Sequence, residues 1–137
     1  MNLIINTANR NKIIVAIGDN KNIIKESLET SFHESEKLIP LIKKVLKKAK
    51  KQLKKIKKII VVTGPGPFTS LRIGIGVANA LALSLNIAVV GFKKDEFKSI
   101  KDLIKKSENK KLKKNNFVKP FYDKKPNITK PKKPWLK

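Results

Sequence analysis

The order of its segments predicts that this chain folds as an α/β domain with a mixed sheet, in the order β-β-β-α-β-α-β. Two observations carry this prediction. Short β-branched runs joined by turn residues open the chain, and a lysine-rich segment with helical periodicity follows them. Between residues 59 and 92, moreover, the only charged residue is Arg72, although lysines crowd both flanks. Because isolated charges are costly to bury, this uncharged stretch is expected to form the interior of the fold, or else a membrane segment.

The first three segments are expected to pair as an antiparallel meander. Strands are predicted over 2–6, 12–17 and 22–28, where Ile, Leu and Val are frequent. The connections between them, 9–11 and 18–20, contain the Asn, Asp and Gly residues that are typical of tight turns.

A helix is predicted from residue 35 to about residue 50. Apolar residues there recur at spacings of three and four and form one stripe, while lysines fill the other face. The stripe consists of Ile39, Ile42, Leu46, Ala49 and Leu53.

The rest of the domain alternates between strand and helix. Buried strands are expected over 56–62 and 87–92. Between them, a second helix that Thr69 or Ser70 could cap is expected to end at Leu85.

This order is the layout of a ribonuclease-H-like domain, which also forms one half of an actin-like ATPase. We place this domain at 1–97. A weak helix is expected over 95–107, and 98–137 is expected to be a lysine-rich linker and a proline-rich tail. Four aromatic residues could dock part of this tail: Phe117, Phe121, Tyr122 and Trp135.

Composition narrows the classes of function. The chain has 137 residues, the length of one domain, and its 33 basic and 10 acidic residues give a net charge of +23. It has no cysteine and one histidine, which excludes a disulfide scaffold and a zinc site built from thiolates or several histidines. No signal peptide is visible, so we expect a cytoplasmic protein. The basic residues are almost all lysines, which permits a nucleic-acid partner but does not favour base-specific contacts.

A membrane helix over 73–92 is the alternative for the uncharged stretch. Polar residues interrupt it at Asn79, Ser84 and Asn86, and it is short for a span. The sequence therefore favours a buried helix and strand.

The turn from Gly64 to Pro67 joins a strand to a helix, which is where anions often bind. However, Pro65 and Pro67 each lack an N–H donor, and the residues that follow match neither a P-loop nor a dinucleotide fingerprint. A rigid, proline-locked turn is the simpler interpretation.

The helix after this turn is apolar nearly all round. One line of large residues and two lines of small residues run along it: Ile73, Val77, Leu81 and Leu85; Gly74, Ala78 and Ala82; Gly76, Ala80 and Ser84. Each helical glycine costs about 1 kcal/mol relative to alanine, so another backbone is expected to approach closely. One side should face the sheet, and the other could face the 36–50 helix or a helix of another protein.

No catalytic set, cofactor site or metal site is predicted. The acidic residues are few and scattered, and no nucleophile accompanies His33. At the turn after the first strand, where actin-like ATPases use a carboxylate toward the metal-nucleotide, the chain has Asn6, whose neutral amide is a poor magnesium ligand.

Two segments, 35–42 and 64–74, resemble the TsaB (YeaZ) family. They read S-E-K-L-I-P-L-I and G-P-G-P-F-T-S-L-R-I-G, against family patterns of about H-S-E-x-L-L-P and G-P-G-S-F-T-G-L-R-I-G. The chain departs from the family at Asn6, where the family has Asp, at Pro67 for Ser and at Ser70 for Gly, and Glu34 stands at the place of the family's His.

The resemblance implies an actin-like (ASKHA) fold and a role in making N6-threonylcarbamoyladenosine in tRNA. It implies a non-catalytic subunit that forms a heterodimer with a TsaD-like transferase, within a complex that includes a TsaE-like ATPase and tRNA. It also implies a homodimer when the protein is alone, and no membrane partner. The family usually has two actin-like subdomains, so we expect a minimal, single-subdomain version.

Two sets of site residues follow. The candidate partner-binding residues are Leu38, Ile42, Leu46, Gly74, Val77, Ala78, Leu81 and Ala82. The family-motif turn consists of Gly64, Pro65, Gly66, Phe68, Thr69, Leu71 and Arg72. Two other functions stay open: an accessory protein that binds tRNA directly through its basic surface and tail, and an independent peptidase or ATPase.

Overall fold

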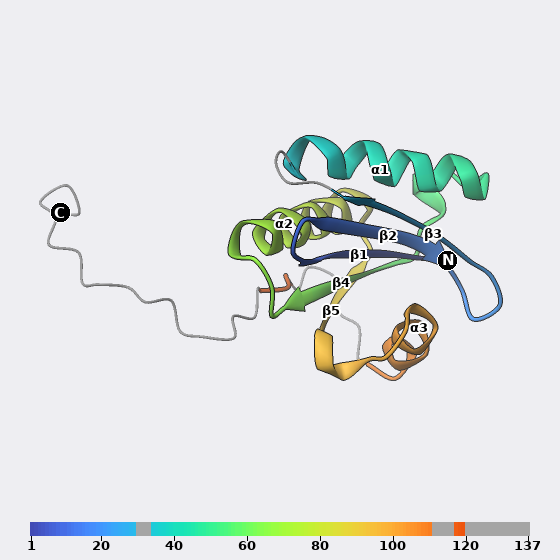
Figure 1. Cartoon of the computed structure of the whole chain (residues 1–137). Helices are drawn as coiled ribbons and strands as arrows, with labels where there is room; N and C mark the ends of the chain where they lie inside the picture. The colour runs from blue at the N-terminus through green and yellow to red at the C-terminus, as the bar shows by residue number, and fades with distance from the viewer. Residues whose placement is uncertain (30–33, 111–116, 120–137) are drawn as a thin grey trace, which may run out of the picture.

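The computed structural model describes residues 1–29, 34–110 and 117–119 (Figure 1). Its elements follow the predicted order, and the weak helix expected over 95–107 is present as an α-helix after the last strand. The strands are β1 (Asn2–Asn9), β2 (Lys12–Gly18), β3 (Ile23–Glu29), β4 (Lys58–Gly64) and β5 (Ala88–Lys93). The helices are α1 (Glu34–Ala49), α2 (Phe68–Leu85) and α3 (Ile100–Glu108), with short 3₁₀ turns η1 (Leu53–Lys55) and η2 (Lys94–Glu96). His33, Phe121, Tyr122 and Trp135 lie outside the described residues.

The five strands form one mixed sheet in the order β3-β2-β1-β4-β5. β1, β2 and β3 pair as the predicted antiparallel meander, whereas β4 runs parallel to both β1 and β5. At the centre of the sheet Ile4 pairs with Ala16 on one side and Ile60 on the other. This topology confirms the ribonuclease-H-like layout.

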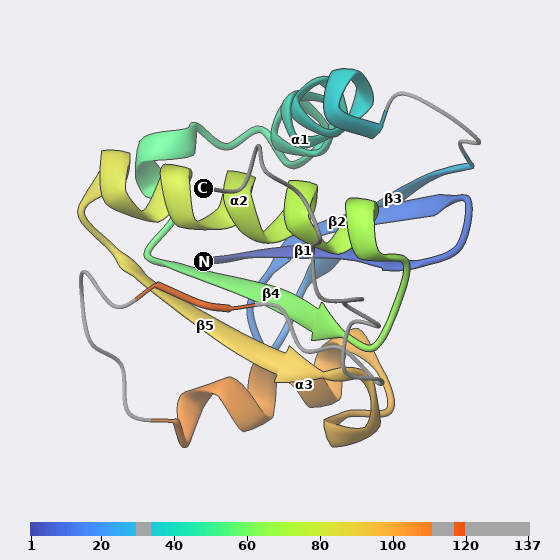
Figure 2. The same cartoon turned by 90° about the vertical axis from the view of Figure 1, so that its left-hand side faces the viewer.

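Helices cover both faces of the sheet. α1 and α2 lie on one face and α3 lies on the other (Figures 1 and 2). The central strands β1 and β4 are buried between these layers, and every residue of β4 is buried. The uncharged stretch therefore does form the interior.

The apolar face of α1 differs from the predicted stripe. Ile39 is 38% exposed, whereas Leu38, Leu41 and Val45 pack on the sheet together with Ile42. Apolar residues occur on two overlapping sides of the helix. The position of α1 over β2 and β3 decides which of these sides is buried. The predicted stripe was wrong at Ile39 for this reason.

α2 begins at Phe68 with Pro67 as its N-cap residue, so neither Thr69 nor Ser70 caps it. By length and composition alone α2 could cross a membrane. In the structure, however, it packs on the sheet, and the run 73–92 is divided between this helix and strand β5. A single membrane helix over 73–92 is therefore wrong for this fold.

The helix α3 extends the folded unit past residue 97, where the sequence placed the boundary. Ser99 caps α3, because its hydroxyl accepts a hydrogen bond from the Asp102 N–H at 3.1 Å. Leu103 and Ile104 are buried in the core. The lysines of this helix lie on its exposed side. The composition of the segment is therefore similar to that of a linker, which explains the predicted boundary.

A buried lysine joins α3 to the sheet. Lys58 Nζ donates to Ser107 Oγ at 2.7 Å, and Ser107 Oγ donates to the Ile104 carbonyl at 2.6 Å. Burial lowers the pKa of Lys58 below its ordinary value, and the charge of Glu108 opposes this only in part. The folded state therefore disfavours the charged form of Lys58.

We expect Lys58→Met to raise the free energy of unfolding by about 1 kcal/mol at pH 7, because an apolar side chain of similar volume removes a poorly solvated charge. The pKa of Lys58 is lower in the folded state than in the unfolded state. The free-energy penalty of burying its charge is therefore full below the folded pKa and disappears as the pH rises toward the unfolded value of 10.5. Urea unfolding at pH 7 and pH 10 measures this, with exposed Lys57→Met as the control. A loss of stability at pH 7 would show that the hydrogen bond outweighs the burial of the charge.

Candidate partner-binding surface

The Gly-Pro turn is held against the end of β1. Gly64 ends β4 with φ at 125°, a conformation that favours glycine, and the Gly64–Pro65 peptide bond is cis. A Cβ on Gly66 would lie 2.7 Å from Ala8 Cα and 2.8 Å from the Ala8 carbonyl carbon. The two backbones therefore touch directly, which is the arrangement of a structural turn.

The rest of the family-motif turn forms the start of α2 and divides into two sides. Leu71 is fully buried and anchors the helix, whereas Thr69 and Arg72 are exposed. Phe68 is 48% exposed, and the Arg72 guanidinium lies 5.3 Å from the centre of its ring, within the range of a cation–π contact. The motif thus supplies both a core anchor and a surface pair.

Six of the eight candidate partner-binding residues are buried inside this chain. These are Leu38, Ile42, Leu46, Gly74, Ala78 and Ala82, and they face the sheet from α1 and α2. Gly74 is small because it lies against Thr7 of β1, not because another protein approaches it. These six were wrong as surface residues, whereas Val77 and Leu81 remain partly exposed.

The side of α2 that points away from the sheet carries a different set of residues, which we call the outer α2 face. It consists of Phe68, Arg72, Gly76, Ala80 and Leu83. Leu83 is 59% exposed, and a Cβ on Gly76 would meet nothing within 4 Å. This face is apolar apart from Arg72 and is open to close approach. The sequence noted the line through Gly76 and Ala80 but did not select it.

A segment from the far end of the described chain lies beside α2 (Figure 2). The Asn79 side chain donates to the Val118 carbonyl and accepts from the Val118 N–H, both at 3.0 Å. Val118 also contacts Gly91 of β5, where a Cβ would lie 2.7 Å from Val118 Cγ1. The segment 117–119 is thus fixed by two hydrogen bonds to the Asn79 side chain and by close packing of Val118 on Gly91. The aromatic side chain of Phe117 is exposed.

Replacing Asn79 tests this clamp. We expect Asn79→Ala to speed hydrogen exchange of the Val118 amide, because that N–H loses its acceptor. The free energy of unfolding should fall by only about 1 kcal/mol. Asn86→Ala, at the exposed C-cap of the same helix, is the control and should leave the Val118 amide protected. Unchanged exchange in Asn79→Ala would show that the segment is held by other contacts.

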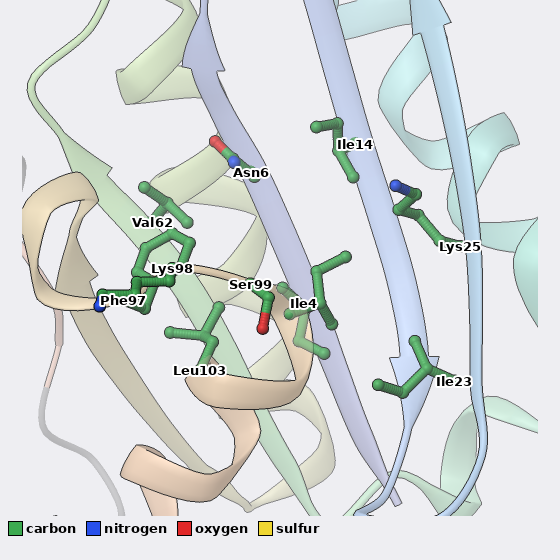
Figure 3. A pocket seen from close by; sticks show the side chains of 11 residues that line it. Ile4, Asn6, Ile14, Ile23, Lys25, Val62, Phe97, Lys98, Ser99 and Leu103 are labelled. Atoms are coloured by element: carbon green, nitrogen blue, oxygen red, sulfur yellow. The ribbon is translucent and has the colours of Figure 1, made fainter.

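The face of the sheet that carries α3 contains a hollow of about 570 Å³ (Figure 3). Its lining is mostly apolar, and its polar members are Asn6, Lys25, Lys98 and Ser99. Asn6 lies inside β1, so the turn expected there was wrong, and its Oδ1 accepts a hydrogen bond from the Ala8 N–H at 3.0 Å where the pairing of β1 with β2 becomes irregular.

The chemistry of this hollow is limited. No carboxylate lines it, and within 1–29, 34–110 and 117–119 no group of three His, Cys, Asp or Glu side chains could hold a metal ion. The outer α2 face is the other candidate site that the structure offers.

Comparison with known proteins finds related sequences and a related fold. The family model described as TsaD: tRNA N6-adenosine threonylcarbamoyltransferase matches residues 27–114, more than half of the chain. The tRNA threonylcarbamoyladenosine biosynthesis protein TsaB of Buchnera aphidicola subsp. Schizaphis graminum (strain Sg) is 38% identical over 77 residues. TsaB of Escherichia coli (strain K12) is 33% identical over 57 residues. The solved structure of YeaZ from Pseudomonas aeruginosa matches with a TM-score of 0.64 and 26% identity.

Each match covers only part of the relative. The aligned residues are 56% of this chain and 37% of the Buchnera protein, and 42% of this chain and 25% of the Escherichia coli protein. The structural match covers 67% of this chain and 43% of YeaZ. The chain thus spans less than half the length of these relatives. Together with the sheet order, the family model and the YeaZ match identify an α/β actin-like fold.

Proposed function

Because this chain belongs to the TsaB/YeaZ family and is matched over residues 27–114 by the TsaD family model, we propose that it is a non-catalytic subunit in tRNA threonylcarbamoyladenosine biosynthesis. In this role it pairs with a TsaD-like transferase in the cytoplasm, within a complex that includes a TsaE-like ATPase and tRNA. Alone, it forms a homodimer through the same surface.

The outer α2 face carries this proposal. An exposed helix face with Gly76 and Ala80 at its centre lets a second helix approach closely, and Phe68 and Leu83 add apolar area at its ends. Protein–protein interfaces are enriched in aromatic and arginine residues, and Phe68 and Arg72 provide one of each here.

Co-expression with a TsaD-like transferase tests the pairing, with size-exclusion chromatography as the measurement. We expect the two proteins to elute together and Ala80→Arg to weaken their affinity about a hundredfold, because it would bury an unpaired charge. Ala80 is exposed, so the variant should fold, which circular dichroism checks. Asn109→Arg, an exposed substitution at the end of α3, is the control and should not change elution.

The two possible failures have different meanings. Separate elution of the unmodified proteins would overturn the pairing itself. Joint elution that Ala80→Arg does not weaken would overturn only the assignment of the outer α2 face. A second candidate function is direct tRNA binding, which the lysine cluster at the end of α1 favours.

A further inference from the structure

The positive charge of this chain is concentrated where α1 leads into β4. Ten of the sixteen residues in 43–58 are lysines, and no acidic residue occurs anywhere between residues 37 and 94. Lysines at this density repel one another, which opposes the compact state unless anions are nearby. This stretch is therefore the strongest candidate for an anion-binding surface.

The fold arranges four of these lysines around one hollow. The end of α1, the turn η1 and the start of β4 meet the start of β1 there, where the Lys57 N–H donates to the Met1 carbonyl at 3.0 Å. The hollow has a volume of about 480 Å³. Its lining consists of Met1, Lys50, Lys51, Gln52, Lys55 and Lys57. We call it the lysine hollow.

Among the residues that the structure describes, no carboxylate lines this hollow. The acidic residue that α1 does meet is Glu26 of β3, and Lys44 and Lys48 already occupy its two oxygens at 3.2 and 2.9 Å. Among the described residues, the four lysines of the hollow take part in no salt bridge. Their charge is thus left uncompensated within this part of the chain.

The backbone at the end of α1 fixes where Lys50 enters this hollow. α1 and α2 end in the same motif, in which the residue after the last helical turn adopts a left-handed conformation. In α2 this residue is Asn86, with φ at 55°, a type that tolerates it. In α1 it is Lys50, with φ at 56°, and the Lys51 N–H bonds back to the Leu46 carbonyl at 3.0 Å. Glycine is favoured at this position, so Lys50→Gly should relieve the backbone without disturbing the end of α1.

We propose that the lysine hollow binds the phosphodiester backbone of a structured RNA. Lysine ammonium groups act as point charges that suit phosphate oxygens, whereas base recognition usually uses the planar fork of arginine. The hollow lies at the end of the sheet where β1 and β4 begin, whereas the Gly-Pro turn lies where β4 ends. The proposal that the hollow binds phosphate groups does not depend on the proposed function. Only the choice of tRNA as the RNA rests on the proposed function.

The test uses the full 137-residue chain and a fluorescently labelled tRNA transcript, with affinity measured by anisotropy from 50 to 200 mM salt. The triple variant Lys51→Gln, Lys55→Gln, Lys57→Gln should weaken binding about tenfold and flatten the salt dependence, since fewer counterions are released. The control is Lys12→Gln, Lys101→Gln, Lys105→Gln, which removes the same charge from exposed sites elsewhere. We expect it to change affinity less than threefold.

Lys50→Gly separates binding from folding. Glycine relieves the left-handed backbone but removes a charge, so the melting temperature should rise while tRNA affinity falls. A variant that is more stable yet binds more weakly excludes unfolding as the cause of the loss.

Three results would overturn the proposal: equal losses in the two triple variants, no loss in either, or equal binding of anionic vesicles and of tRNA that both depends on the hollow. The first would mean that net charge acts diffusely, and the last that the ligand is a membrane surface. Co-elution of the hollow variant with a TsaD-like transferase is measured in parallel. If co-elution persists while tRNA binding is unaffected by the variant, only this proposal fails, and the proposed function stands.

Discussion

Gly74→Ala is expected to lower the free energy of unfolding by about 3 kcal/mol, because the added methyl group has no room in a packed layer. Its Cβ would lie 2.8 Å from Thr7 Cγ2 and would also overlap the Thr7 hydroxyl. Thr7 is fully buried in the central strand β1, so it cannot move aside without shifting the sheet. Alanine otherwise favours helices, so the sign of this effect depends entirely on the contact between α2 and β1.

Gly76→Ala is the matched control on the same helix. Nothing lies within 4 Å of the position that its Cβ would take, so alanine should raise the free energy of unfolding by up to about 1 kcal/mol through helix propensity. Urea unfolding followed by circular dichroism measures both variants. Opposite signs are the expected result. If Gly74→Ala were as stabilising as Gly76→Ala, the close packing of α2 on β1 would be wrong.

These two glycines also show what the sequence left undecided. Periodicity identified two lines of small residues on α2, and either could have faced the sheet. The structure places the Gly74 line inward and the Gly76 line outward. One signal could have separated them, since Arg72 stands one helical turn before Gly76 and a lone charge is not buried without a partner.

The order of elements was predictable because it depends on local patterns. β-branched runs, turn residues and a long uncharged stretch each indicate one element, and all five strands and three helices of the described chain occur where these patterns lie. The phase of α1 was less predictable. Leu38, Ile39, Leu41, Ile42, Val45 and Leu46 offer several apolar stripes. Only the position of the helix over the sheet leaves Ile39 outside.

Contacts between segments that are distant in the sequence could not be predicted from it. Lys58 bonds to Ser107 across 49 residues, and Asn79 to Val118 across 39. Neither pair has a motif, because polar residues at such separations meet only once the layers are assembled. The candidate site follows the same rule. Its residues lie on one helix, but which of them remain exposed depends on what packs beneath.

The helix α3 gives the sharpest test of where the domain ends. Leu103 is 1% exposed and packs into the core on the face of the sheet opposite α1 and α2. We expect Leu103→Ala to lower the free energy of unfolding by about 3 kcal/mol, since truncation removes buried area and leaves a cavity. Urea unfolding should show one transition that moves as a whole to lower denaturant concentration.

Lys105→Ala on the exposed side of the same helix is the control, because it shortens a side chain to the same methyl group without opening a cavity. Its effect should stay within about 0.5 kcal/mol. Were Leu103→Ala equally mild, α3 would be an appendage and the domain would end near residue 97. A large loss of stability in Leu103→Ala, without one in Lys105→Ala, means instead that the lysine-rich segment after residue 97 contains a helix that the core requires. In that case a lysine-rich segment is not a linker here. The exposed side of a helix and a linker can have the same lysine content, and they differ only in the apolar residues that lie between the lysines.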